Sequence, residues 1–402
     1  MRRRRVLLLG GGVCVSAALG TPMPRARAQG PAVLPLQLLR TGDIGGLPWV
    51  ELPLGGRATR WLVDSGASIA LVAPALAQAL KLERRADLRV AGAGGVQRLP
   101  RFALPPLPLP NAAARAEAAA LDLASLLGPA GATLDGLIGA PWLREAVTRF
   151  DFARGELSWP QRAAAPAGPS AQLPLRWDAG LPVLSLALGE RRAEPFLFDT
   201  GNAGALVLFA QRARTLLDAT AAPLPASTVR ELGGSVRALH ARIERVSTAG
   251  WTMRALPAAF ENGAPGERGA HFDRLSGSLG CAAFEAGAVT LDGPGGRLLV
   301  ELPGLPEPAP LAGGFGLRLE AGGAAPRVAA VFDAGPAAAA GVAPGQWLLG
   351  LDGDDARGWA PEQVWQRLAG RMQAEFALGA EAADAAPRRV TLRREAFFPL
   401  WR

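Results

Sequence analysis

An internal repeat constrains the fold of this chain more than any other feature of its sequence. The run Trp61-Leu62-Val63-Asp64-Ser65-Gly66-Ala67-Ser68 recurs as Phe196-Leu197-Phe198-Asp199-Thr200-Gly201-Asn202-Ala203. Further along, Leu134-Asp135-Gly136-Leu137-Ile138-Gly139 recurs as Leu275-Ser276-Gly277-Ser278-Leu279-Gly280, at an offset of 141 residues. Two motifs repeated in the same order indicate two copies of one structural unit.

The residues of each copy predict an aspartate at a turn that follows one apolar strand and lies beside another. Asp64 and Asp199 each follow apolar residues that are typical of a strand. The glycine of each turn, Gly66 or Gly201, lets two backbones approach closely because it has no Cβ. If the two copies pair about a pseudo-twofold axis, the two carboxylates meet at that axis.

A pair of adjacent carboxylates predicts acid–base chemistry on a bound water. Two carboxylates about 3 Å apart share one proton. The ionised group then acts as a general base on water, and the protonated group donates to a substrate carbonyl. This chemistry needs no histidine, no metal and no cofactor, and we expect none of the three in the site.

Cysteine and histidine are scarce, which argues against other common site types. Once a signal peptide containing Cys14 is removed, the chain keeps Cys281, His240 and His271. They are too few and too scattered for a usual zinc site or for histidine-dependent nucleophilic catalysis. We interpret Cys281 as a small core residue and both histidines as surface or loop groups.

The repeated motifs closely resemble those of retropepsin-like aspartic proteases, and the tandem arrangement is similar to the exported bacterial members. The resemblance covers residues 33 to 303. It implies a mainly β fold with two β-barrel lobes, residues 33–160 and 172–303, and endopeptidase activity on peptide or protein substrates. It also implies that the hydroxyls of Ser65 and Thr200 cross-brace the two active-site turns. Asn202 and Ser278 depart from the family pattern, which leaves the activity of the second lobe open.

A glycine-rich segment lies between the two motifs of each copy. These segments contain Gly94 and Gly95 in the first copy and Gly233 and Gly234 in the second. We expect each to be the tip of a β-hairpin that closes over the cleft as a flap.

The C-terminal part, residues 311–395, resembles a bacterial PDZ domain, an α+β module. Gly335-Pro336-Ala337 begins a small-residue helix, Pro344-Gly345 predicts a turn, and Pro361 to Leu368 reads as a second helix. The resemblance implies that the loop Gly314-Phe315-Gly316-Leu317 binds a peptide carboxylate through backbone N–H groups while the peptide adds a strand.

The first 28 residues have the three parts of a signal peptide. Arginines at positions 2 to 5 precede an apolar run, Val6 to Leu19, and Ala26-Arg27-Ala28 is a small-residue cleavage site. We therefore expect export to the periplasm, with a loose match to a twin-arginine signal. This segment carries six arginines and no acid, so the net charge of +8 falls to about +2 once it is removed, which argues against a nucleic-acid partner. After signal cleavage we expect no membrane span, and the oligomeric state stays open.

Two functions remain open from the sequence. One is an exported aspartic endopeptidase that activates water with Asp64 and Asp199 and binds peptide tails through its C-terminal domain. The alternative is a catalytically inactive periplasmic peptide-binding protein on the same scaffold.

Overall fold

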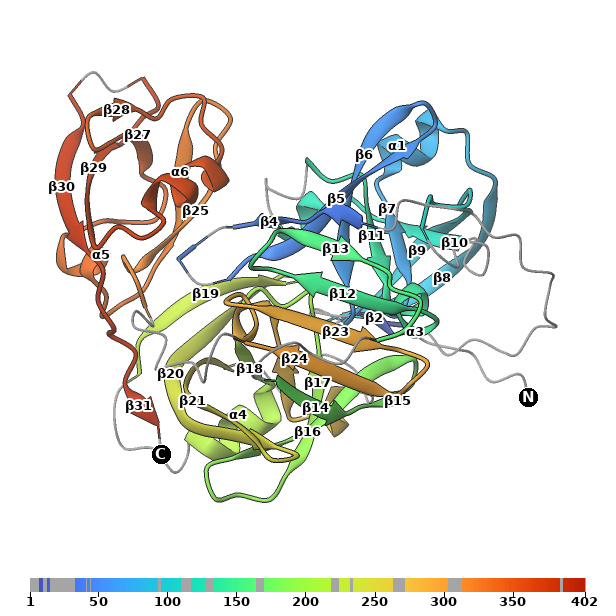
Figure 1. The fold of residues 1–402 in the computed structure, drawn as a ribbon. Coiled ribbons are helices and arrows are strands. Elements are labelled where there is room, and N and C mark those ends of the chain that lie inside the picture. The colour runs from blue at the N-terminus through green and yellow to red at the C-terminus, as the bar shows by residue number, and fades with distance from the viewer. Residues whose placement is uncertain are drawn as a thin grey trace.

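The computed structural model describes most of the chain, and the described part is mainly β (Figure 1). Its strands form four sheets, which we call the N-terminal, second, shared and C-terminal sheets. The described residues are 7–9, 13–14, 33–40, 42–43, 45–92, 95–109, 117–127, 133–163, 170–217, 224–231, 234–262, 272–302, 313–383 and 386–401.

The N-terminal sheet has the strand order β2-β1-β8-β9-β10-β7-β11-β6-β5-β4. Its strands are β1 (Leu7–Leu9), β2 (Val13–Cys14), β4 (Gln37–Leu39), β5 (Leu47–Leu54), β6 (Arg57–Asp64), β7 (Ala70–Val72), β8 (Arg84–Gly92), β9 (Gly95–Ala103), β10 (Glu117–Ala120) and β11 (Gly136–Gly139). The turn at Gly55 and Gly56 joins β5 to β6, and both glycines have positive φ, as a tight hairpin requires. Strands β1 and β2 lie within the predicted signal peptide and pair at the β8 edge.

The second sheet repeats this topology. Its strands are β15 (Arg176–Asp178), β16 (Leu181–Leu188), β17 (Glu194–Phe198), β18 (Leu206–Leu208), β19 (Ala226–Glu231), β20 (Gly234–Thr248), β21 (Trp251–Glu261), β22 (Gly277–Leu279) and β31 (Leu400–Trp401). The order β4-β5-β6-β11-β7-β10-β9-β8 becomes β15-β16-β17-β22-β18-β21-β20-β19, with every strand number raised by eleven. An additional pairing of β16 with β20 closes six of these strands into a barrel.

The shared sheet joins the two copies in the order β14-β24-β23-β12-β13-β3. Its strands are β3 (Val33–Pro35), β12 (Val147–Asp151), β13 (Glu156–Ser158), β14 (Ser170–Pro174), β23 (Ala288–Asp292) and β24 (Arg297–Glu301). At its centre Arg149 pairs with Thr290, which lies 141 positions later, the offset of the repeat. Equivalent residues pair in this way when two copies of a strand meet across a twofold axis.

The C-terminal sheet stands apart from the other three in Figure 1. Its order is β25-β26-β27-β29-β30, with β28 beside β27. The strands are β25 (Leu317–Ala321), β26 (Pro326–Val331), β27 (Trp347–Leu351), β28 (Asp354–Asp355), β29 (Gln373–Gly379) and β30 (Arg388–Arg393), and the helices are α5 (Pro336–Ala339) and α6 (Pro361–Leu368). Its apolar side chains form a separate core around Phe315, Phe376 and Leu348.

Short helices connect strands in the part of the chain that forms the first three sheets. They are α1 (Pro74–Ala79), α2 (Ala124–Leu127), α3 (Ala140–Arg144) and α4 (Ala210–Leu217), with the 3₁₀ turns η3 (Phe272–Arg274) and η4 (Cys281–Ala283). Pro74 begins α1 because its fixed φ suits the first helical turn, where no N–H is needed. No helix among the described residues is long and apolar enough to cross a membrane.

The C-terminal strand β31 returns to the second sheet, a pairing that no pattern in the sequence predicts. Strand β31 pairs with β20, as Figure 1 shows, and Trp401 packs near Phe260 with ring centroids 6.3 Å apart.

The prediction that His240 is a surface or loop group was wrong. His240 is buried in β20, where it stacks on Phe398 and its Nε2 lies 2.8 Å from the hydroxyl of Ser227. His271 lies outside the described residues.

Candidate active site

Each copy places its aspartate where two parallel strands end side by side. Asp64 is the last residue of β6, and it pairs with Gly139 of β11. Asp199 directly follows β17, and its N–H donates to the carbonyl of Leu279 in β22 at 3.0 Å. The later apolar strand therefore lies beside the turn in both copies, as the spacing of the motifs predicts.

The two turns are tied together by their hydroxyl side chains. The Ser65 N–H donates to the Thr200 hydroxyl at 2.9 Å, and the Thr200 N–H donates to the Ser65 hydroxyl at 2.9 Å. Each hydroxyl also donates across the axis, Ser65 to the carbonyl of Phe198 at 2.8 Å and Thr200 to that of Val63 at 2.7 Å. These four reciprocal bonds hold the turns in one fixed relation, with the geometry that the family resemblance implies.

The turn glycines give each carboxylate room against the opposite turn. A Cβ on Gly66 would lie 2.3 Å from Oδ1 of Asp199, and one on Gly201 would lie 2.4 Å from Cγ of Asp64. Any larger residue at either position would push the carboxylates apart, since 2.4 Å is far inside van der Waals contact.

The two carboxylates are buried, and each lies against the glycine of the opposite turn. Asp64 is 4% exposed and Asp199 1% exposed. Each accepts a bond from the glycine N–H of its own turn, at 2.8 Å from Gly66 and 2.9 Å from Gly201. Burial raises the pKa of Asp64 well above its usual range, against the opposing effect of hydrogen bonds from Gly66 and with Asp199. A buried pair of this kind holds one proton between two groups, which provides one acid and one base.

The aspartyl protease family model matches residues 50–142. That stretch runs from β5 to α3 and contains the first turn and its glycine strand, so this part of the chain is similar to aspartyl proteases. No curated protein matches the chain significantly.

The second turn, outside the aspartyl protease match, brings together the two residues that depart from the family pattern. The Asn202 side-chain amide donates to the Ser278 hydroxyl at 3.1 Å, and its oxygen accepts from the Gly204 N–H at 2.9 Å. The side chains of Asn202 and Ser278 therefore both have hydrogen-bond partners. The departures form one local structure that keeps the Asp199 turn in place.

Cys281 is a buried core residue, as predicted. Its thiol lies 3.3 Å from the carbonyl of Thr200. Burial raises its pKa well above the ordinary value, and the negative charge of Glu285 adds to the shift. A protonated thiol of this kind supports the turn and is a poor nucleophile. No group of three histidine, cysteine or acidic residues that could hold a metal occurs in the part of the chain that the structure describes.

Two of the four predicted flap residues, Gly95 and Gly234, lie in hairpins. Strands β8 and β9 pair up to Gly92 and Gly95, and β19 and β20 pair up to Glu231 and Gly234. Gly95 and Gly234 begin the second strand of each hairpin. Gly94 and Gly233 lie outside the described residues.

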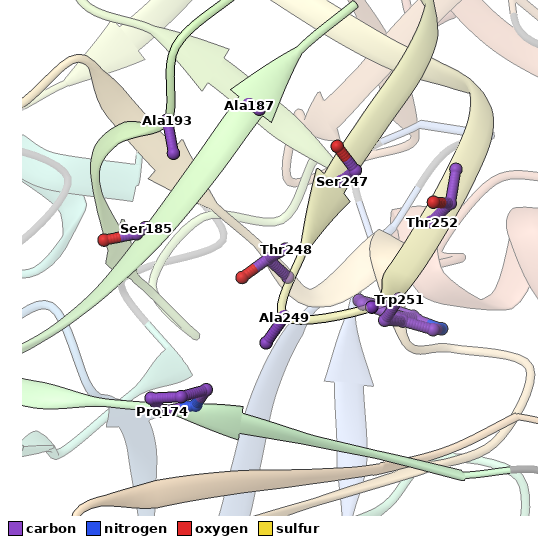
Figure 2. Close-up of a pocket in the computed structure, with 10 residues that line it drawn as sticks. Pro174, Ser185, Ala187, Ala193, Ser247, Thr248, Ala249, Trp251 and Thr252 are labelled. Carbon is purple, nitrogen blue, oxygen red and sulfur yellow. The ribbon is translucent and has the colours of Figure 1, made fainter.

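Two surface hollows contain none of the predicted site residues. One is lined by Ser185 and Ala187 of β16, Pro174, and the β20–β21 turn around Ala249 (Figure 2). The other lies between α1 and β9. Neither hollow is lined by a pair of carboxylates.

The predicted carboxylate-binding loop, Gly314 to Leu317, leads into β25 and not into the carboxylate pair. Gly314 and Gly316 have positive φ, which glycine adopts without strain. The Phe315 N–H donates to the side chain of Asp43, and Arg394 lies beside the same carboxylate. Sequence reasoning missed Asp43 and Arg394, because neither belongs to a repeated motif.

Proposed function

We propose that this protein is an exported aspartic endopeptidase of two tandem retropepsin-like lobes, followed by a PDZ-like module. Asp64 and Asp199 are the proposed catalytic pair, with Ser65, Gly66, Thr200 and Gly201 as the turns that support it. The observation that carries the proposal is the reciprocal bonding of Ser65 and Thr200 around two buried carboxylates, each of which lies against the glycine of the opposite turn. The aspartyl protease match over residues 50–142 supports peptidase activity for the first half.

The proposed reaction uses the single shared proton. The ionised carboxylate takes a proton from a bound water as the water oxygen attacks the peptide carbonyl carbon. The protonated carboxyl donates its proton to the carbonyl oxygen, which gives a neutral tetrahedral diol. The carboxyl that received the water proton then donates it to the amide nitrogen, while the other, now ionised, carboxylate takes a proton from one diol hydroxyl. The C–N bond breaks as the carbonyl re-forms, which releases an acid and an amine and leaves the pair with one shared proton. No metal or other cofactor takes part.

Three further roles belong to the proposal. The hairpin tips at Gly94, Gly95, Gly233 and Gly234 would act as flaps over the cleft. The loop Gly314-Phe315-Gly316-Leu317 would hold a peptide carboxylate, and the first 28 residues would direct export to the periplasm. The domain ranges 33–160, 172–303 and 311–395 remain proposals. The strands β3 to β13, β15 to β24 and β25 to β30 lie within them, and β14 begins two residues before the second range.

The test is digestion of a random peptide library by the mature protein and by its Asp64→Asn variant. We expect the wild type to produce internal cuts at acidic pH and the variant to produce almost none, with the fold intact by circular dichroism. A wild type that binds peptides but cleaves none would favour the alternative, a catalytically inactive peptide-binding protein. Equal cleavage by both proteins would reject Asp64 as a catalytic group.

A further inference from the structure

One edge of the C-terminal sheet carries an added segment from the start of the chain. Strand β25 is the last strand in its sheet and pairs only with β26 among the described strands. On its other edge, Gly42 forms an antiparallel bridge with Arg318. A peptide that adds a strand to this sheet would use the same edge.

A carboxylate occupies the glycine loop at the start of that edge. The Phe315 N–H donates to Oδ2 of Asp43 at 2.7 Å, and Nη2 of Arg394 lies 2.9 Å from Oδ1. The contact is close, because a Cβ on Gly314 would lie 2.2 Å from Oδ2 of Asp43. The Asp43 side chain is 6% exposed, and burial raises its pKa to about 6 against the opposing effects of Phe315 and Arg394.

Asp43 presents the same chemical group as the end of a peptide. A side-chain carboxylate and a terminal carboxylate both accept bonds from a backbone N–H and a guanidinium. The strand bridge at Gly42 and the carboxylate of Asp43 stand in the relation that the last residues of a bound peptide would have. Arg394 adds a charge to a site for which backbone N–H groups alone were predicted.

The same segment also reaches the second turn of the candidate active site. Arg40 forms an ion pair with Glu285 at 3.1 Å. Gly45 lies against the turn, since a Cβ there would be 1.6 Å from the carbonyl oxygen of Ala203. Gly42 and Asp43 therefore lie at the carboxylate-binding loop, while Arg40 and Gly45 on either side of them in the sequence contact the neighbourhood of Asp199.

We propose that Gly42 and Asp43 are an internal ligand of the C-terminal module, and that a peptide with a free carboxyl terminus binds there by displacing them. The inference rests on the proposed tail-binding role of this module and not on peptidase activity. A site that is filled most of the time binds an outside ligand more weakly, in proportion to the fraction of molecules in which it is open. Removing the Asp43 carboxylate should therefore increase the affinity of the module for a peptide with a free carboxyl terminus.

The experiment measures fluorescence anisotropy of a fluorescein-labelled peptide that ends in an apolar residue with a free carboxylate. The full mature chain is used in an Asp64→Asn background, so that cleavage cannot interfere. We expect Asp43→Ala to bind this probe about tenfold more tightly than the parent, the worth of one charge-assisted hydrogen bond. Arg394→Gln should bind it more weakly than the parent, and the same peptide ending in an amide should bind all variants weakly.

The matched control is Asp333→Asn. Asp333 forms an ion pair with Arg237 at 3.0 Å, which also joins the C-terminal part to the second sheet but lies outside the loop. This variant should bind the probe as the parent does. A gain equal to that of Asp43→Ala would show that loosened packing, not a vacated site, explains the effect and would overturn the proposal.

Hydrogen exchange provides a second measurement that needs no substitution at Asp43. Saturating the parent protein with the free-acid probe should speed exchange in peptides that contain Gly42 and Asp43. Unchanged exchange together with equal probe affinity of parent and Asp43→Ala would reject the internal ligand and leave tail binding standing. Absence of binding in every variant would reject both.

Discussion

The two aspartate turns share one backbone design but differ in the side chains behind it. In the first turn Ala67 and Leu137 are apolar and belong to the same buried cluster. At the equivalent places of the second turn, Asn202 and Ser278 are polar and hydrogen-bonded to each other. The comparison teaches that the two residues at these places act together: either both are apolar, as Ala67 and Leu137 are, or both are polar, as Asn202 and Ser278 are. In the second turn a hydrogen bond between the two side chains takes the place of the apolar contacts of the first turn.

The largest expected effect tests whether the two turns contribute equally. Asp64→Asn and Asp199→Asn should each lower kcat/KM for a peptide substrate by about 1,000-fold or more, because each removes one member of a shared-proton pair. Steady-state kinetics on a fluorogenic peptide selected from the library digestion measures both losses. A variant at Asp199 that keeps near-normal activity would restrict the chemistry to the first turn.

The next effect is the pH dependence of the pair. Burial raises the pKa of Asp64, so the folded protein keeps the shared proton to higher pH than an exposed aspartate would. Activity should therefore be present at acidic pH and fall by about tenfold per pH unit once the pair loses that proton. Because the native state binds the extra proton, the free energy of unfolding should also decrease as the pH rises through this range.

Urea unfolding as a function of pH checks the second part of this prediction. Asp64→Asn carries no titrating group at that position, so its free energy of unfolding should depend less on pH over the same range. Equal pH dependence in both proteins would assign the titration to other groups.

A smaller effect compares the two hydroxyl braces. Ser65→Ala and Thr200→Val each leave a buried carbonyl and a buried N–H without a partner, so each should lower the free energy of unfolding by roughly 3 kcal/mol. Ser65→Thr and Thr200→Ser keep the hydroxyl and are the matched controls. Urea midpoints measure all four variants, and unequal losses for Ser65→Ala and Thr200→Val would show that the braces are not reciprocal in energy.

The smallest effect tests the pair behind the second turn. Asn202→Ala should cost about 1–2 kcal/mol, since the Ser278 hydroxyl and the Gly204 N–H lose their partner. The double variant Asn202→Ala with Ser278→Leu recreates the side chains of the first turn and should be more stable than Asn202→Ala alone. A double-mutant cycle measures the coupling. Strictly additive losses would contradict the idea that the two residues act as a pair.

Local patterns in the sequence determined most of the elements and the identity of the candidate site. The helix predicted over Pro361 to Leu368 is observed with those bounds, and α5 begins at Pro336, where the small-residue helix is predicted. The sequence also predicts the strand that ends at Gly139 and the strand that precedes Gly280, because apolar periodicity and glycine positions are local signals. Both strands lie beside the aspartate turns. The aspartates were identifiable because the repeat places the same turn in both copies.

Tertiary structure alone decided which distant groups meet. Nothing near His240 in the sequence indicates that Phe398, 158 positions later, covers its ring. The return of Trp401 to β20 and the contact of Asp43 with Phe315 likewise join segments that are far apart in the chain. A sequence pattern records the periodicity and turn preference of each segment, whereas burial and the pairing of charges depend on which surfaces the whole fold brings into contact.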